Sequence, residues 1–297
     1  MADRLNRYTD RQEAELNRKI EQIYADAGRK AQALTDAYMK PFQAESERRL
    51  KQVEAGEITK ADYQLWLQTE VLTGPAWERT ASQIAQIYVD ADAQARELTG
   101  VTTRQTYGAA LEYTADAIGK AAPKAVRGGI SFDLYDQHAV DRMLKENPQT
   151  LPEWKIDEKK DYTWNYQRVK NTIAQGIVSG ESVHKIGQRL TGELAARNAK
   201  KMEMFARTAL TGAENAGRVE RLKETEAQGI RVLKKWLAVH DARTRDAHAA
   251  LDGQTRKPDE DFDSELGPIK YPGDPTADPA NVYNCRCTLV YVYPDFD

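Results

Sequence analysis

The chain has 297 residues, with 46 acidic and 43 basic side chains and a formal net charge of −3. This length is enough for one large or two modest domains with a buried core. The near balance of charge argues against a globally basic nucleic-acid binder.

The sequence also lacks export and membrane signals. No apolar run approaches the length of a membrane-spanning helix, and the charged N-terminus has no apolar signal-peptide core. We therefore expect a protein of the reducing cytoplasm, without membrane contact. Two cysteines give no disulfide framework.

The N-terminal part reads as a helical arm. Residues 10–56 are almost all helix formers, and apolar residues follow at intervals of three, four or seven at Leu16, Ile20, Ile23, Ala27 and Leu34. This spacing places an apolar stripe on one side of a long helix. Pro41 should kink or end the first segment. The pattern predicts a helical hairpin, with a self-associating coiled coil as the alternative.

Further helices are expected up to a break at residues 121–129. The second covers 57–72, the third opens at Pro75 and ends at Gly100, and the fourth covers 103–120. The break contains Pro123 and the pair Gly128 and Gly129, which are typical of a hinge or domain boundary. We therefore predict an arm at 1–129 and a second domain at 130–297.

The second domain begins with helices at 136–146, 161–178 and 182–194, the second interrupted by Gly176 and Gly180, and the third capped by Ser182. A further helix at 199–228 carries a polar stripe. One interpretation of the stripe is a solvated face. Thr and Asn are unusual on an exposed helical face, so the other is that the stripe packs against the C-terminal segment and hydrogen-bonds to its loop. The stripe consists of Arg207, Thr208, Thr211, Asn215 and Arg218.

Residues 229–297 form the motif block. A strand is predicted at 230–240, a short helix at 242–251 capped by Asp241, a turn at Asp252-Gly253 and a final strand at 288–293. A proline-rich loop of this length, at 254–283, is unusual unless it is functional or held by something. The chain as a whole is therefore predicted to be α+β and predominantly helical, with a small C-terminal antiparallel sheet.

One candidate for holding the loop is a zinc ion. In an extended segment the side chains of Cys285 and Cys287 point to one face, with Cα atoms about 6.6 Å apart, so both thiolates can reach one tetrahedral ion. His248 would be a third ligand, and His240 or Asp241 a fourth. In the alternative, the cysteines are small buried hydrophobes and His248 is hydrogen-bonded to the loop backbone.

Two arginines lie where a helix dipole disfavours positive charge. Arg243 and Arg245 fall in the first turn of the predicted short helix. We expect them to pair with loop carboxylates or with an external anion, the carboxylate candidates being Asp259, Glu260, Asp261 and Asp274.

Catalysis has little support in the sequence. A ββα-metal nuclease would use residues of the types found at His240, His248 and Asn284, but the order of elements fits poorly. No Gly-rich phosphate loop, GxSxG or HExxH motif is present. We therefore expect a protein that is not an enzyme.

Short motifs follow one another in a fixed order in the second domain. They are Gln175-Gly-Ile177 with Gly180, Ala206-Arg-Thr208, Trp236, Asp241 to Arg245, His248 with Leu251 to Gln254, Phe262, Tyr271 to Asp274, and Asn284 to Cys287. In this order they resemble the phage Mu F-like minor head proteins, also called the phage head morphogenesis family. The resemblance covers roughly residues 130–297 and marks Arg207, Trp236, Arg243, Arg245, Asp252, Gly253 and Asn284 as structural motif residues.

The resemblance implies a structural minor head protein of a tailed phage or prophage. It implies association with the portal protein and a role in head assembly, DNA packaging or ejection, with scaffold, major capsid protein and DNA as further candidate partners. The implied location is the virion, and the host cytoplasm during assembly. The alternative is a metal-dependent nuclease or toxin-like domain, because the family's module also occurs in proteins with toxic activities. A non-enzymatic DNA-binding protein would need a contiguous basic face.

Overall fold

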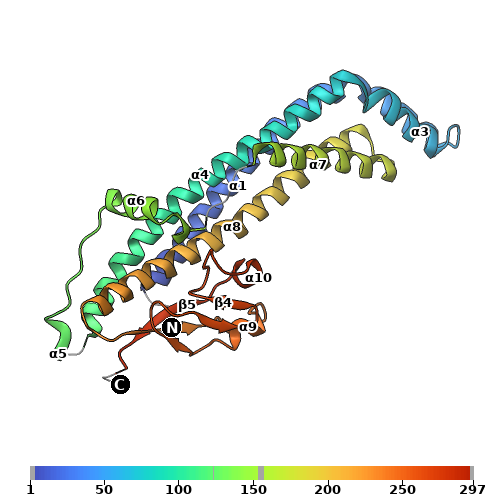
Figure 1. Cartoon of the computed structure of the whole chain (residues 1–297). Coiled ribbons are helices and arrows are strands. Elements are labelled where there is room, and N and C mark those ends of the chain that lie inside the picture. The colour runs from blue at the N-terminus through green and yellow to red at the C-terminus, as the bar shows by residue number, and fades with distance from the viewer. Residues whose placement is uncertain (1–3, 123, 153–156, 295–297) are drawn as a thin grey trace. The chain divides into compact units, whose positions relative to one another are not determined.

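The computed structural model describes residues 4–122, 124–152 and 157–294, and it is mainly helical (Figure 1). The long helices are α1 (Arg4–Met39), α4 (Gly74–Ala121), α7 (Glu158–Ser179) and α8 (Val183–Ala227). The shorter ones are α2 (Gln43–Glu54), α3 (Lys60–Trp66), α5 (Lys124–Arg127), α6 (Gln137–Glu146), α9 (Asp246–Ala249), α10 (Pro279–Val282), the 3₁₀ turns η1 (Lys40–Phe42) and η3 (Pro148–Thr150), and the π-helical turn η2 (Leu67–Val71). The predicted helical N-terminal arm and the small C-terminal antiparallel sheet are both confirmed.

Among the residues that the structure describes, no helix is long and apolar enough to cross a membrane.

Several helix ends follow from local sequence. Pro41 lies in η1, between α1 and α2, as its missing amide donor requires. Thr59 caps α3 in a reciprocal capping box with Asp62. Gly180 ends α7 in the left-handed conformation that glycine adopts at low cost. Pro123, within the predicted break at 121–129, lies outside the described residues.

Two predicted breaks are wrong. The segments on either side of Gly100 form the single helix α4, and the predicted helices at 182–194 and 199–228 form the single helix α8. One glycine inside a helix costs only about 1 kcal/mol relative to alanine, and the threonines beside Gly100 are buried, so packing overrides their weak helix preference. Gly176 also lies inside α7, where a Cβ atom would come within 2.7 Å of the side chain of Ile186.

The chain divides into two compact units. Unit 1 comprises Met1–Asn17, Glu97–Trp154 and Glu203–Asp297, and unit 2 comprises Arg18–Arg96 and Lys155–Met202. Because α1, α4 and α8 each contribute residues to both units, these units do not coincide with the segments 1–129 and 130–297. A division of the sequence at residue 129 stays a prediction.

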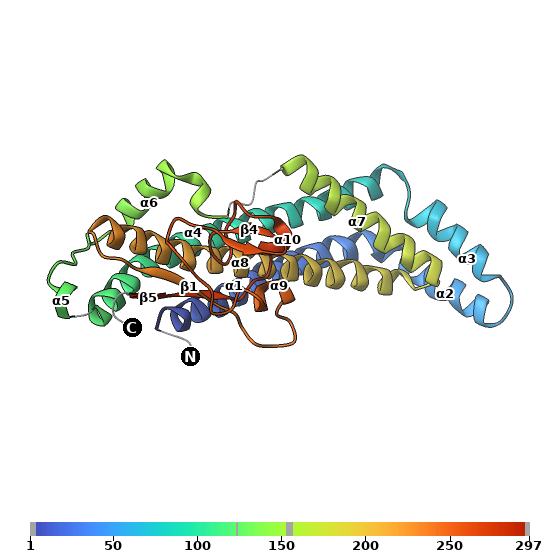
Figure 2. The same cartoon turned by 60° about the horizontal axis from the view of Figure 1, so that its bottom comes forward.

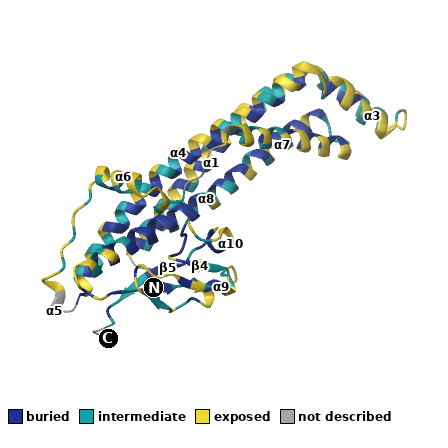
Figure 3. Ribbon diagram, viewed as in Figure 1, coloured by how far each residue is buried: buried dark blue, intermediate teal, exposed yellow. Residues whose placement is uncertain are grey.

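Unit 2 is an all-helical body in which buried and exposed faces alternate along the long helices (Figure 3). Ile20 and Ala27 of the predicted apolar stripe are buried in it. Its interior also holds polar groups: the Tyr24 hydroxyl donates to Asp92, and Arg96 pairs with Asp161 at 2.6 Å. The apolar stripe therefore packs within the chain, as a helical hairpin requires.

Unit 1 contains the C-terminal sheets beside α8 (Figure 2). Strands β1 (Leu233–Leu237), β2 (Thr255–Arg256) and β5 (Thr288–Val292) form an antiparallel sheet in the order β2-β1-β5, and β3 (Phe262–Ser264) pairs with β4 (Gly267–Ile269). In the register of β1 and β5, Trp236 lies opposite Leu289. These two residues share one core cluster with Ala213 and Ala216 of α8 and with both cysteines.

Candidate functional site

The polar stripe of α8 holds the turn that precedes β5, as the second interpretation of the stripe predicts. The Thr208 hydroxyl accepts from the amide of Asn284 at 2.9 Å, and the Thr211 hydroxyl donates to the carbonyl of Cys285 at 3.2 Å. Asn215 accepts from the amide of Leu289 at 2.8 Å. The stripe thus satisfies backbone groups of the C-terminal segment that would otherwise be buried without partners.

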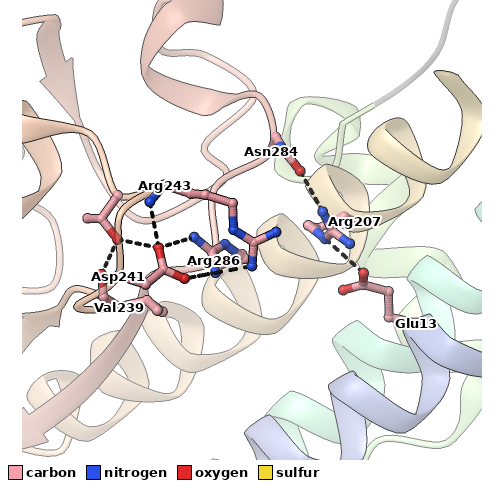
Figure 4. A network of polar contacts seen from close by, with 8 residues as sticks. Glu13, Arg207, Val239, Asp241, Arg243, Asn284 and Arg286 are labelled. Carbon is pink, nitrogen blue, oxygen red and sulfur yellow. Dashed lines mark hydrogen bonds and ion pairs between the residues drawn. The ribbon is translucent and has the colours of Figure 1, made fainter. Parts of the chain in front are cut away.

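Asn284 makes the sharpest bend in this turn. Among the described residues it is the only non-glycine with a positive φ, at 58°, a conformation that asparagine tolerates better than most side chains. Its side-chain oxygen accepts from Arg207 at 2.8 Å, while Arg207 also pairs with Glu13 of α1 at 2.8 Å (Figure 4). Arg207 therefore connects α1, α8 and the C-terminal turn.

A buried carboxylate of α8 also attaches the C-terminal segment to this helix. Glu214 of α8 is 4% exposed and accepts from Asn6 at 2.7 Å, from Thr288 at 3.0 Å and from Arg218 at 3.0 Å. A buried charge is tolerated when it is paired and hydrogen-bonded in this way. Glu214 was not singled out from the sequence, although its neighbour Arg218 was.

Asp241 does not lie with the cysteines. Its carboxylate makes a two-pronged ion pair with Arg286, at 2.5 and 2.7 Å, and accepts from the amide of Arg243 at 2.9 Å (Figure 4). These contacts, the pair with Arg286 foremost, hold the pKa of Asp241 well below its usual range. The carboxylate that the sequence suggested as a fourth metal ligand is therefore occupied by a guanidinium group.

Among the described residues, the expected pairing of Arg243 and Arg245 with loop carboxylates is not found. Arg243 lies 3.7 Å from Asp241, and Arg245 donates to the carbonyl of Tyr283. The helix they were assigned to is shorter than predicted, since α9 covers only Asp246–Ala249. With no helix beginning at residue 242, the dipole argument for a carboxylate partner does not apply to these positions.

The turn at Asp252 and Gly253 locks α9 to β1. Asp252 accepts from the amide of Ala238 at 2.8 Å and from the ring of His240 at 3.1 Å. Gly253 has a φ of 78° and donates to the carbonyl of Trp236 at 2.9 Å. His240 is thereby committed to Asp252 and is not part of the cysteine cluster.

Three of the predicted ligands do converge. The Nδ1 atom of His248 lies 3.5 Å from Sγ of Cys285 and 3.6 Å from Sγ of Cys287, and all three ligand atoms lie within 4.8 Å of one another. The residues are 1%, 2% and 4% exposed, respectively. Trp236 packs edge-on against the imidazole, with ring centroids 5.5 Å apart.

The orientation of the imidazole follows from its other nitrogen. Nε2 of His248 lies 3.0 Å from the backbone carbonyl oxygen of Asn281 and 2.9 Å from the side-chain oxygen of the same residue. A carbonyl oxygen can only accept, so Nε2 carries the proton. In the neutral ring, Nδ1 therefore presents its lone pair to the two sulfur atoms.

The two thiols differ in acidity. The pKa of Cys287 is lowered because the Cys285 thiol donates to it, with further contributions from His248 and the backbone amide of Val239. The pKa of Cys285 is raised by the same pairing and by burial. Cys287 therefore carries the thiolate when the pair holds a single proton.

Three features of the site were missed in the sequence. Arg286 lies between the two cysteines in the sequence. Because side chains alternate along an extended segment, Arg286 points to the face opposite the two sulfur atoms, and this could have been predicted. No sequence pattern indicated a role for Asn281. Gly273 of the Tyr271 to Asp274 motif meets Gly212 of α8 so closely that a Cβ atom on Gly273 would lie 2.5 Å from the Gly212 nitrogen.

Comparison with known proteins places part of the sequence in a family. Residues 167–290 match the family model described as "Phage Mu protein F like protein". This segment is a Mu F-like domain. It includes the second half of α7, all of α8 and the histidine and cysteines of the cluster. The family resemblance found in the sequence is thus confirmed.

Two curated relatives share part of the chain. The "Minor head protein GP7" of Bacillus phage SPP1 is 32% identical over 167 residues, which are 55% of this chain and 52% of the relative. The "NAD(+)--arginine ADP-ribosyltransferase EFV" of Enterococcus faecalis (strain ATCC 700802 / V583) is 33% identical over 130 residues, 42% of this chain and 26% of the relative. The chain thus spans about half of the first relative and about a quarter of the second. No solved structure matches it.

Proposed function

We propose that the chain is a structural minor head protein of a tailed phage or prophage that acts in head assembly and is part of the virion. The match of residues 167–290 to the Mu F-like family carries this proposal, and the similarity to a minor head protein of Bacillus phage SPP1 supports it. The motif residues Arg207, Asn284 and Asp252 are engaged in holding the C-terminal segment together. This use of the motifs is consistent with a structural role rather than a catalytic one.

The finer proposal concerns partners. We infer that the chain associates with the portal protein during assembly in the host cytoplasm, and that scaffold, major capsid protein and DNA are further candidate partners. Its role would extend to DNA packaging or ejection if it stays with the portal in the mature head.

The partner proposal is tested by co-expression. The tagged chain is produced with the portal protein encoded by the same phage or prophage, and the two are separated by size-exclusion chromatography. We expect them to co-elute, whereas the portal of an unrelated phage, used as a control, should elute alone. Separate elution of the cognate pair, together with normal DNA-filled heads after deletion of the gene, would contradict the proposal.

A toxin-like activity is the second candidate, supported by the 130-residue alignment with an arginine ADP-ribosyltransferase. The metal-dependent nuclease considered from the sequence is tested in the same experiment. The purified chain is incubated with NAD⁺ and an arginine-containing acceptor, and separately with plasmid DNA and Mg²⁺ or Zn²⁺. We expect neither transfer nor cleavage. Either reaction, above the level of a control without the chain, would favour the toxin-like candidate.

A further inference from the structure

We propose that His248, Cys285 and Cys287 bind one zinc ion, and that this ion fastens the long C-terminal loop to the sheet of unit 1. The inference concerns the folding of this domain and is independent of the proposed role in phage heads. It rests on the geometry of three buried side chains from two segments of the chain.

The distances between the ligand atoms suit zinc. With Zn–S of about 2.3 Å, Zn–N of about 2.05 Å and tetrahedral angles, a sulfur and a nitrogen ligand lie about 3.6 Å apart. The two observed Sγ to Nδ1 distances are 3.5 and 3.6 Å. Both sulfur atoms therefore already have the spacing from the imidazole nitrogen that a shared ion requires.

The outer contacts are those of a metal-binding histidine. Nε2 donates to Asn281, which fixes the ring and leaves the lone pair of Nδ1 for a metal. Asn281 is itself fully buried and donates to the carbonyl of Gly267 at 2.9 Å. The histidine is thus oriented by Asn281, a loop residue whose own side chain is fixed by its hydrogen bond to Gly267.

One sulfur atom also accepts a hydrogen bond from the backbone, which would support negative charge on it. The amide of Cys287 donates to Sγ of Cys285 at 3.4 Å. Two thiolates and a divalent cation sum to zero charge, which lowers the cost of burying the site. Soft thiolate ligands with one imidazole select zinc over magnesium or calcium, which prefer oxygen ligands.

The ion would close a large loop. His248 lies in α9, and the cysteines lie 37 and 39 residues later, directly before β5. A cross-link between such distant positions limits the unfolded chain more than a local contact does. Because the three ligands are almost fully buried, we assign the ion a structural role.

The experiment uses the full chain, purified with a tag that contains no histidines and dialysed against metal-free buffer. We expect one zinc ion per chain by elemental analysis, and two thiols that react with a thiol reagent only after a strong chelator is added. The variants Cys287→Ser and His248→Gln should lose the zinc. His240→Gln, which removes a nearby ring that is bound to Asp252, is the matched control and should keep it.

A second measurement on the wild-type chain avoids dependence on folding of the variants. The zinc is removed and Co²⁺ is added; we expect the intense visible bands of tetrahedral cobalt and a near-ultraviolet sulfur-to-cobalt charge-transfer band. A folded wild-type chain that retains no zinc, shows no such bands and has two freely reacting thiols would overturn the proposal. Zinc retained at the wild-type level by His248→Gln would overturn the ligand assignment.

Discussion

Substitution of Gly273 by alanine tests the contact between the Tyr271 to Asp274 turn and α8. Gly273 has a φ of +81°, and an added Cβ would lie 2.5 Å from the nitrogen and 2.7 Å from the Cα of Gly212. The left-handed conformation costs a non-glycine residue about 1–2 kcal/mol, and overpacking against a backbone that cannot move freely adds about 1–3 kcal/mol. We therefore expect Gly273→Ala to lower the free energy of unfolding by about 2–5 kcal/mol.

Substitutions at two other glycines separate the cost of the backbone conformation from the cost of overpacking. Gly229 has the same φ of +81° but nothing within 4 Å of an added Cβ, so Gly229→Ala should cost only about 1–2 kcal/mol. Gly212 is helical, and its Cβ would lie 2.6 Å from the carbonyl oxygen of Gly273. The gain of about 1 kcal/mol in helix propensity offsets part of that clash, so Gly212→Ala should be milder than Gly273→Ala.

The assay is urea unfolding at neutral pH, followed by tryptophan fluorescence, to which the buried Trp236 contributes together with the other four tryptophans. The three variants are compared at the same protein concentration, and equal slopes of the transitions validate the comparison. The reasoning is refuted if Gly273→Ala costs no more than Gly229→Ala, because the close approach to α8 would then contribute nothing.

Three further predictions concern the same domain. Asn215→Ala leaves the buried amide of Leu289 without its acceptor and should cost about 1–3 kcal/mol in urea unfolding; a loss below about 0.5 kcal/mol, the range of ordinary surface substitutions, would argue against the bond. Asp241→Asn should lower the unfolding midpoint at pH 7. Because Arg286 depresses the pKa of Asp241 in the folded state, this effect should fade as pH falls below the ordinary carboxyl range, and an effect that persists at low pH would contradict the pairing. Burial lowers the pKa of Lys234 to about 8. Between pH 8 and 10 the unfolded chain therefore binds more protons than the folded chain, so the free energy of unfolding should rise with pH relative to that of a Lys234→Met variant. Parallel pH profiles of the two proteins would contradict this.

The attachment of the C-terminal segment could be predicted from the sequence because the composition of α8 is unusual. Thr208, Thr211 and Asn215 are poor choices for an exposed helical face, and each has a backbone partner in the C-terminal segment. The convergence of Cys285 and Cys287 was also predictable, since alternate side chains of an extended segment share one face.

The pairing partners within the block could not be predicted in the same way. Asp241 reads equally as a helix cap or as a metal ligand, and its partner Arg286 lies 45 residues away. Gly212 and Gly273 are both visible in the sequence, but no local pattern indicates that one faces the other. The long helices α4 and α8 show the converse error, because the local sequence predicted breaks at positions where packing keeps the helix continuous.

The central proposal is that this chain, with its Mu F-like segment at 167–290, is a component of phage heads. The most direct measurement is quantitative mass spectrometry of heads purified on a density gradient from the phage or induced prophage that encodes the chain. The account predicts that its peptides co-sediment with the heads, at a small number of copies relative to the major capsid protein. Peptides found only in the soluble fraction of the lysate, with heads that lack the chain, would contradict it.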